Sequence, residues 1–145
     1  MWQRNEKEVG TTKCPGGQPG IFWYIRSMDY TDELLEYWRR PTNFGVLGIY
    51  THTRCMHNEF CGDRVEWYLQ IKKGRVEAVS WNGEGCVLCV VGASVVSEKV
   101  KLIKSMKLIK LIESREVLED MGVKDLSPTR LKCALLGWEG IRDLF

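Results

Sequence analysis

Apolar and polar residues alternate along two neighbouring segments near the middle of the chain. From Arg64 to Lys72 an apolar residue stands at every second position, the period that places those side chains on one face of a β-strand. Arg75 to Trp81 follows Lys73-Gly74, a dipeptide that fits a tight turn, and is predicted to face Val76, Ala78 or Val79, and Trp81 inward. These two segments are therefore predicted to form a β-hairpin. A third strand is predicted over Gly45 to Thr53, which contains several β-forming residues.

The predicted helices begin before this hairpin and resume after it. The first extends at least from Asp29 to Arg40, with Thr31 as its N-cap and Pro41 as its stop. The second covers Val87 to Val100. It contains so few polar residues that it is expected to be buried against the sheet.

The C-terminal third of the chain is also predicted to be helical. Residues 99–113 continue the apolar helix after a bend, and Glu116 to Met121 form a short helix capped by Gly122. Ser127-Pro128 then supplies the N-cap and first position of a last helix, which carries Cys133. The order of helix, three strands and further helices predicts an α+β fold, in which a three-stranded antiparallel sheet packs against several helices.

Composition narrows the class of protein. With 145 residues, 44% of them apolar, the chain fits one globular domain with a sizeable core. Residues 1–20 are polar and rich in Gly and Pro, so they are expected to be a flexible extension, and residues 21–145 are expected to be the domain. No apolar stretch fits a secretory signal or approaches the ~18 residues of a membrane span. A cytoplasmic protein without a membrane partner is therefore expected.

The charge distribution adds one feature. A formal net charge of +2 gives no reason to expect a nucleic-acid partner. Lys101, Lys104, Lys107 and Lys110 nevertheless recur at every third position. We interpret this repeat as a solvated helix face. A docking surface for an acidic partner and a membrane-surface helix are the alternatives.

The candidate chemistry lies in three of the cysteines. Cys61-Gly62-Asp63 occurs where a loop becomes a strand, and Gly62 allows both flanking side chains to turn toward one centre. Gly85-Cys86 precedes the apolar helix, whose N-terminal dipole is expected to lower the pKa of this thiol. The hairpin should bring the two segments to one edge of the sheet, and Cys133 supplies a third thiol. Three thiols and one carboxylate make a four-ligand set for a soft or borderline metal.

The other cysteines and the histidines are not predicted to be ligands. Cys14 is alone in the N-terminal extension. Cys89 forms a C-x-x-C with Cys86, but its apolar surroundings favour a small core residue; the thioredoxin-like alternative needs a βαβ context that the pattern lacks. No zinc-finger spacing relates the remaining candidates, which are His52, Cys55 and His57.

Together these segments resemble the IscU/SufU/NifU N-terminal family of iron–sulfur cluster assembly proteins, over about Asp29 to Leu144. Glu59 replaces the proline of the family's N-P-x-C-G-D motif. Pro41–Gly45 is similar to the family's P-x-N-x-G motif, and Asn58–Asp63 is similar to N-P-x-C-G-D. Gly83–Cys86 is similar to G-x-G-C, and Ala93-Ser94 to the A-S that follows it. Ser127–Leu136 is similar to the region of the third family cysteine.

The resemblance implies an IscU/SufU-like fold in which Cys61, Asp63, Cys86 and Cys133 converge on one exposed site. In this family the site accepts sulfur from a cysteine desulfurase of the IscS, SufS or NifS type. It binds iron, builds a transient [2Fe-2S] cluster and passes the cluster to recipient apoproteins, and it often holds Zn²⁺ when no cluster is present. The three cysteines are the candidate sulfur acceptors, and a scaffold needs no catalytic residue. Whether cluster-loaded chains form a homodimer is left open by the sequence.

Departures from the family pattern leave two functions open. Lys132 stands where the scaffold branch has a histidine, and Arg130 to Ala134 is more similar to the SufU branch. That branch, however, has a longer segment between its second and third cysteines. The expected function is a cluster scaffold, and the alternative is a SufU-like zinc-dependent sulfurtransferase that works with a desulfurase. A module with purely structural Zn²⁺ is a third interpretation.

Overall fold

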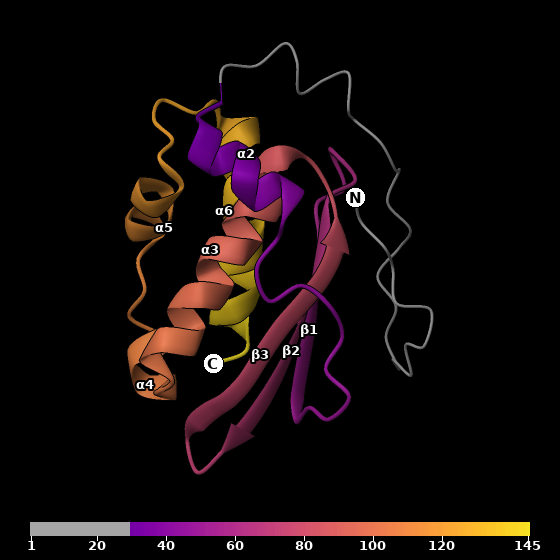
Figure 1. Cartoon of the computed structure of the whole chain (residues 1–145), viewed down its shortest axis with the longest axis vertical. Coiled ribbons are helices and arrows are strands. Elements are labelled where there is room, and N and C mark those ends of the chain that lie inside the picture. The colour runs from indigo at the N-terminus through magenta and orange to yellow at the C-terminus, as the bar shows by residue number, and fades with distance from the viewer. Residues whose placement is uncertain (1–29) are drawn as a thin grey trace.

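Three antiparallel strands form a sheet that lies to one side of the helices (Figure 1). The computed structural model describes residues 30–145, so the extension predicted over residues 1–20 lies outside the described residues. The strands lie in the order β1-β2-β3 and are β1 (His52–His57), β2 (Arg64–Lys72) and β3 (Arg75–Glu84). The predicted α+β class and three-stranded antiparallel sheet are thus confirmed.

The β2–β3 hairpin forms at the predicted turn. Lys72 lies opposite Arg75, and both turn residues between them have positive φ, as the tightest hairpin turns require. β3 is longer than predicted, because it continues to Glu84, which pairs with Arg64. The predicted strand end at Trp81 is therefore too early, because Asn82, Gly83 and Glu84 also belong to β3.

The predicted strand over Gly45 to Thr53 is also wrong for most of its length. The chain pairs first with the outer edge of β3, where Gly45 donates a 2.8 Å hydrogen bond to the Trp81 carbonyl. It reaches the other side of β2 at Thr51, whose N–H donates to the Leu69 carbonyl at 2.8 Å. The segment between these contacts crosses the sheet and so cannot pair along it, and the paired strand β1 begins only at His52.

Within residues 30–145, five helices follow the predicted order. They are α2 (Asp32–Arg39), α3 (Val87–Ile103), α4 (Met106–Ile109), α5 (Ser114–Met121) and α6 (Pro128–Asp143). The Thr31 and Ser127 side chains cap α2 and α6 as predicted, although α2 begins at Asp32 rather than Asp29. The predicted bend is at Lys104, which ends α3 at a φ of 60°.

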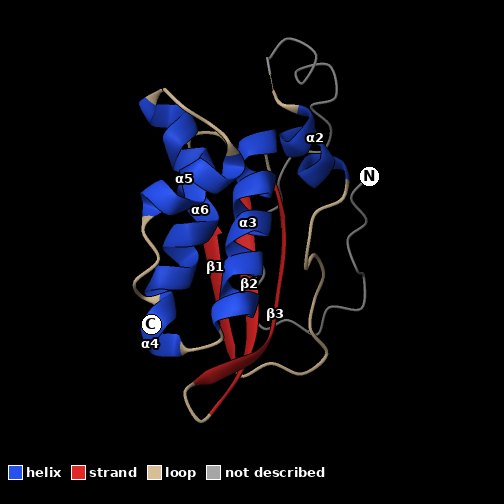
Figure 2. Ribbon diagram, turned by 60° about the vertical axis from the view of Figure 1, so that its left-hand side comes forward, coloured by secondary structure: helices blue, strands red, loops and turns tan. Residues whose placement is uncertain are grey.

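α3 and α6 cover one face of the sheet (Figure 2). The indole N–H of Trp67 in β2 donates a 2.9 Å hydrogen bond to the Gly137 carbonyl in α6. The two helices pack closely at Gly92, where a Cβ atom would overlap the Ala134 carbonyl oxygen. This close packing fixes the position of Cys133, the residue before Ala134, beside α3.

Candidate metal centre

The loop between β1 and β2 is held in a tight turn by Asn58. The Asn58 N–H donates to the Asp63 carbonyl and the Gly62 N–H donates to the Asn58 carbonyl, both at 2.8 Å. The Asn58 side-chain oxygen accepts from the Phe60 N–H at 3.1 Å. Gly62 has a φ of 72°, a conformation that glycine adopts without strain. The turn leaves Cys61 exposed and places the Asp63 side chain in the interior.

Asp63 joins this loop to the N-terminus of α3. The pairing of Arg64 with Glu84 places Asp63 beside Gly85 and Cys86. Asp63 Oδ1 accepts a 3.0 Å hydrogen bond from the Cys86 N–H, and the Cys86 thiol lies 3.4 Å from Asp63 Oδ2. A Cβ atom on Gly85 would lie 2.8 Å from Asp63 Oδ1, so this contact requires glycine. The predicted meeting of the two ends of the hairpin is confirmed.

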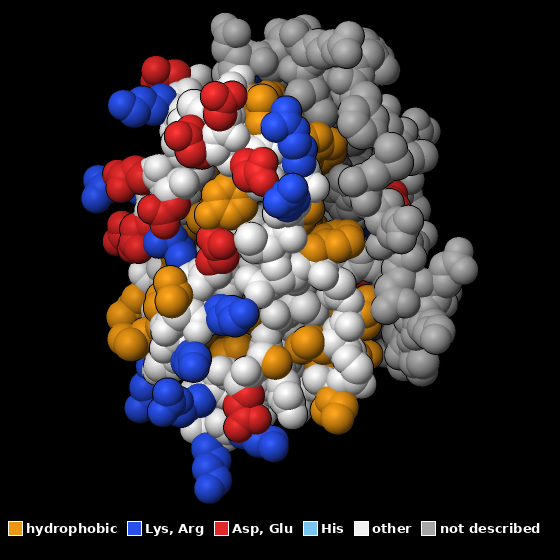
Figure 3. Space-filling view, in the orientation of Figure 1, with side chains coloured by type: hydrophobic (Ala, Val, Ile, Leu, Met, Phe, Trp, Pro, Cys, Tyr) orange, Lys and Arg blue, Asp and Glu red, His pale blue; other side chains and the backbone are white. Residues whose placement is uncertain are grey.

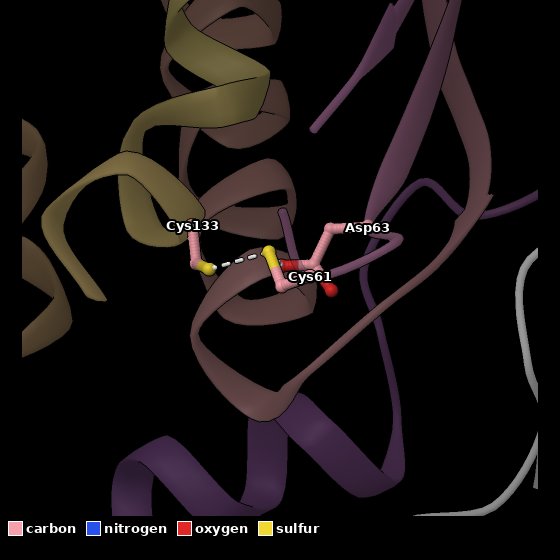
Figure 4. Close-up of side chains that lie close together, drawn as sticks. All are labelled: Cys61, Asp63 and Cys133. Carbon is pink, nitrogen blue, oxygen red and sulfur yellow. Dashed lines mark hydrogen bonds between the residues drawn. The ribbon is translucent and has the colours of Figure 1, made fainter. Parts of the chain in front are cut away.

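α6 brings the third thiol to the same place (Figure 4). Cys61 Sγ lies 3.1 Å from Cys133 Sγ and 3.2 Å from Asp63 Oδ2. The ligand atoms of Cys61, Asp63 and Cys133 all lie within 4.8 Å of one another, the one such group of His, Cys, Asp or Glu within residues 30–145. Cys86 stands outside this group of three, although its thiol contacts Asp63 and hydrogen-bonds to Cys133.

The surroundings of Cys61 and Cys133 favour the protonated form of both thiols. A hydrogen bond with Cys86 and burial both raise the pKa of Cys133. Burial also raises the pKa of Cys61, against the opposing effect of its hydrogen bond with Cys133. A metal ion that binds these sulfurs must therefore displace their protons. The donor set fits Zn²⁺ or iron, which both accept thiolates and carboxylate oxygens.

The other candidates within residues 30–145 do not belong to this compact group. Cys89 is 1% exposed within α3, and burial raises its pKa well above the usual range, which confirms the core interpretation. His52, Cys55 and His57 belong to β1 and join no group of three possible ligands among the described residues. Cys14 lies outside the described residues.

Two residues beside the centre were not predicted. Asn58 holds the ligand loop, and its side-chain nitrogen lies 4.0 Å from Cys133 Sγ. Its place at the start of the N-x-x-C-G-D segment is the signal that could have indicated this role. Phe60 is 87% exposed next to Cys61, and the Lys132 ammonium lies 5.4 Å from its ring centroid.

Comparison with known sequences supports the family resemblance. Residues 29–143 match the family described as NifU-like N terminal domain. The zinc-dependent sulfurtransferase SufU of Bacillus subtilis is 25% identical over 127 residues, which cover 77% of this chain and 86% of that protein. The iron-sulfur cluster assembly scaffold protein IscU of Thermotoga maritima is 27% identical over 133 residues, or 82% of this chain and 94% of that protein.

Solved structures share the fold. A putative iron-sulfur cluster assembly scaffold protein for the SUF system from Fervidobacterium islandicum superposes with a TM-score of 0.63 at 20% identity. The match covers 79% of this chain and 95% of that one. The N-terminal part of a NifU-like protein from Brucella abortus gives a TM-score of 0.59 at 18% identity, over 79% of this chain and 90% of that one.

Proposed function

Because the chain belongs to the IscU/SufU/NifU N-terminal family, we propose that it is a scaffold for iron–sulfur cluster assembly. It accepts sulfur from a cysteine desulfurase, binds iron and a transient [2Fe-2S] cluster, and transfers the cluster to recipient apoproteins. The proposed ligands are Cys61, Asp63, Cys86 and Cys133. The observation that carries the proposal is the 3.1 Å separation of the Cys61 and Cys133 sulfurs beside the Asp63 carboxylate.

The mixed donor set suits a cluster that is held temporarily. Thiolates bind iron–sulfur clusters strongly, whereas a carboxylate oxygen is a harder ligand that matches soft centres less well. Asp63 would therefore be the weakest of the four attachments. Cys61 is exposed and Cys86 is half-buried, so a cluster at this edge would be accessible to an acceptor protein.

The same thiols are suited to receive sulfur. A thiolate attacks the outer sulfur of a persulfide on the donor protein, and the donor cysteine leaves as a thiolate. The acceptor then carries the persulfide, and later reduction to sulfide takes two electrons from an external reductant. Cys61 is open to a donor without rearrangement, whereas the side chain of Cys133 is buried behind it.

A zinc-dependent sulfurtransferase is the second candidate function. Three thiolates and one carboxylate make up the four ligands that Zn²⁺ takes in closed sites. Lys132 before Cys133 also favours this candidate, because it removes the histidine of the scaffold branch. In this function Zn²⁺ remains with the protein, and a site thiol passes sulfur from a desulfurase to an acceptor.

Anaerobic purification, metal analysis and reconstitution with iron and sulfide test the proposal. We expect visible absorption bands of a [2Fe-2S] cluster. We also expect this cluster to be transferred to an acceptor apoprotein over time. Cys61→Ser should abolish stable assembly. Cys89→Ala is the matched control. Cys89 is a buried thiol outside the compact group, so this variant should assemble a normal cluster.

The result also separates the two functions. A protein that retains stoichiometric Zn²⁺, rejects iron and accepts persulfide sulfur would refute the scaffold and support the sulfurtransferase. Sedimentation of the cluster-loaded sample measures whether two chains share one cluster.

A further inference from the structure

The β2–β3 turn lies at the end of the hairpin that is farthest from the metal centre. It is attached to the junction of α3 and α4, because Val76 N–H donates to the Lys104 carbonyl at 2.7 Å and Met106 N–H donates to the Gly74 carbonyl at 3.1 Å. We call the exposed surface of this turn, of the last turn of α3 and of residues 104–111 the basic tip. The centre and the tip occupy opposite ends of β2, about 30 Å apart at ~3.3 Å per residue.

Positive charge dominates the basic tip. A hollow of about 600 Å³ is lined by Lys72, Lys73, Arg75 and Lys104, together with Val76 and one carboxylate, that of Glu77. Lys72 and Glu77 form an ion pair at 3.6 Å. The charges of Lys73, Arg75 and Lys104 are therefore not balanced by a carboxylate of the hollow.

Further lysines extend this charge along α3 and α4. Lys101, Lys107 and Lys110 are all exposed. The bend at Lys104 divides the predicted lysine repeat, so Lys101 lies on α3 and Lys107 on α4 rather than on one continuous helix face. Figure 3 shows basic side chains gathered at this end, over α4 and the hairpin turn.

Exposed leucines lie among these lysines. Leu102 is 83% exposed, Leu108 53% and Leu111 68%. Large hydrophobic side chains so exposed are few within residues 30–145, and most of them are in this short stretch. Ile109 and Ile112 are buried and attach the segment to the core, so the leucines project from a fixed backbone. Hydrophobic and basic side chains are neighbours over α4 in Figure 3.

We propose that the basic tip binds the surface of a membrane that contains anionic phospholipids. Clustered lysines are attracted to phosphate headgroups, and leucines enter the headgroup boundary while lysine stems extend toward water. Protein interfaces are poor in lysine, and their energetic hot spots favour Trp, Tyr and Arg over Leu. A tip rich in Lys and Leu therefore fits an anionic membrane better than an acidic protein.

This inference revises the expectation that the protein has no membrane partner. Within residues 30–145 no helix is both long and apolar enough to cross a membrane, so the contact proposed is peripheral. With the tip on the membrane, the metal centre at the other end of β2 would face away from it. The inference does not depend on the proposed function, because the two regions share no residue.

Co-sedimentation with lipid vesicles tests the proposal. The full-length protein should pellet with vesicles of phosphatidylcholine and phosphatidylglycerol at low salt, remain in solution with phosphatidylcholine alone, and dissociate as salt rises. Lys104→Gln and Lys107→Gln should each weaken binding about fivefold. The double variant Leu108→Gln/Leu111→Gln should weaken it as well. All four residues are exposed, so these variants should fold normally.

Matched controls come from exposed residues elsewhere. Lys124→Gln removes an exposed lysine and Ile49→Gln an apolar side chain that is 74% exposed, and both should bind vesicles like the wild type. Failure to pellet with anionic vesicles at low salt would overturn the proposal, as would equal binding by the tip variants and the controls. Soluble polyglutamate is the competitor, added so that its carboxylate concentration equals the lipid phosphate concentration. If it displaces the protein from the vesicles, the tip would instead be a binding surface for an acidic protein.

Discussion

Asp63 Oδ1 accepts a 3.0 Å hydrogen bond from the backbone N–H of Cys86, while Asp63 Oδ2 lies 3.2 Å from the Cys61 sulfur. One carboxylate therefore holds the start of α3 against the start of β2 and also offers an oxygen to the candidate metal centre. Two kinds of substitution at Asp63 can separate these roles.

Asp63→Asn keeps an oxygen that can accept the Cys86 N–H but removes the anionic ligand. We expect this variant to retain most of the stability of the metal-free protein, whereas Asp63→Ala should lose about 1 kcal/mol with the hydrogen bond. In the scaffold function both should still assemble a cluster on three thiolates but transfer it more slowly, since the hard ligand is gone. In the zinc function both should weaken Zn²⁺ binding.

The measurements are a transfer time course, a zinc titration and urea unfolding of the metal-free protein. Wild-type behaviour of both variants in transfer and zinc binding would show that Asp63 is a turn residue and not a ligand.

Gly85→Ala should disturb the metal centre by displacing the Asp63 carboxylate. The added Cβ would lie 2.8 Å from Asp63 Oδ1 and 3.0 Å from the Cys89 Cβ, so the carboxylate must move. We expect at least about a tenfold loss of zinc affinity, comparable to the loss of a residue that orients ligands. Gly48→Ala is the control, because its Cβ meets nothing within 4 Å. Equal affinity of the two variants in a competition titration would contradict the importance of this contact.

Gly92→Ala should separate α3 from α6. Its methyl group would overlap the Ala134 carbonyl oxygen, and overpacking of this kind costs about 1–3 kcal/mol. Because Cys133 precedes Ala134, we expect zinc affinity to fall together with the free energy of unfolding. Chemical unfolding and a zinc titration measure the two effects. Lower stability with unchanged zinc affinity would show that Cys133 is positioned independently of this helix packing.

Metal binding should strengthen as pH rises. The pKa values of Cys61 and Cys133 lie above the ordinary 9.0, so both thiols are protonated at neutral pH and the metal must displace their protons. Affinity should rise by about tenfold per pH unit for each proton released, measured by zinc titration between about pH 6 and pH 8. Affinity that is independent of pH would exclude these thiols as the ligands.

Metal-free stability should change in the opposite direction. A thiol whose pKa is higher in the folded protein than in the unfolded protein stabilises the fold. This contribution is fully present below the unfolded pKa and is lost as pH rises through the folded pKa. The melting temperature of the metal-free protein should therefore fall above about pH 9, and bound Zn²⁺ should suppress the fall.

The sequence by itself determined the features that depend on local chemistry. The two-residue period of Arg64 to Lys72 and the turn at Lys73-Gly74 predicted the hairpin, because alternation directly reports which side chains share a face. Thr31 and Ser127 revealed two helix starts, because their hydroxyls accept nearby backbone N–H groups. The cysteine motifs indicated the family and the four candidate ligands.

The tertiary structure decided what depends on packing between distant parts of the chain. The strand predicted over Gly45 to Thr53 failed because that segment contacts the edge of β3 and then the far side of β2, and no local pattern records such a path. The 3.1 Å approach of Cys61 to Cys133, 72 residues apart, depends on how closely α6 packs against α3 at Gly92. Residue types can predict which side chains suit a metal, but only the packing of helices on the sheet fixes the distances between them.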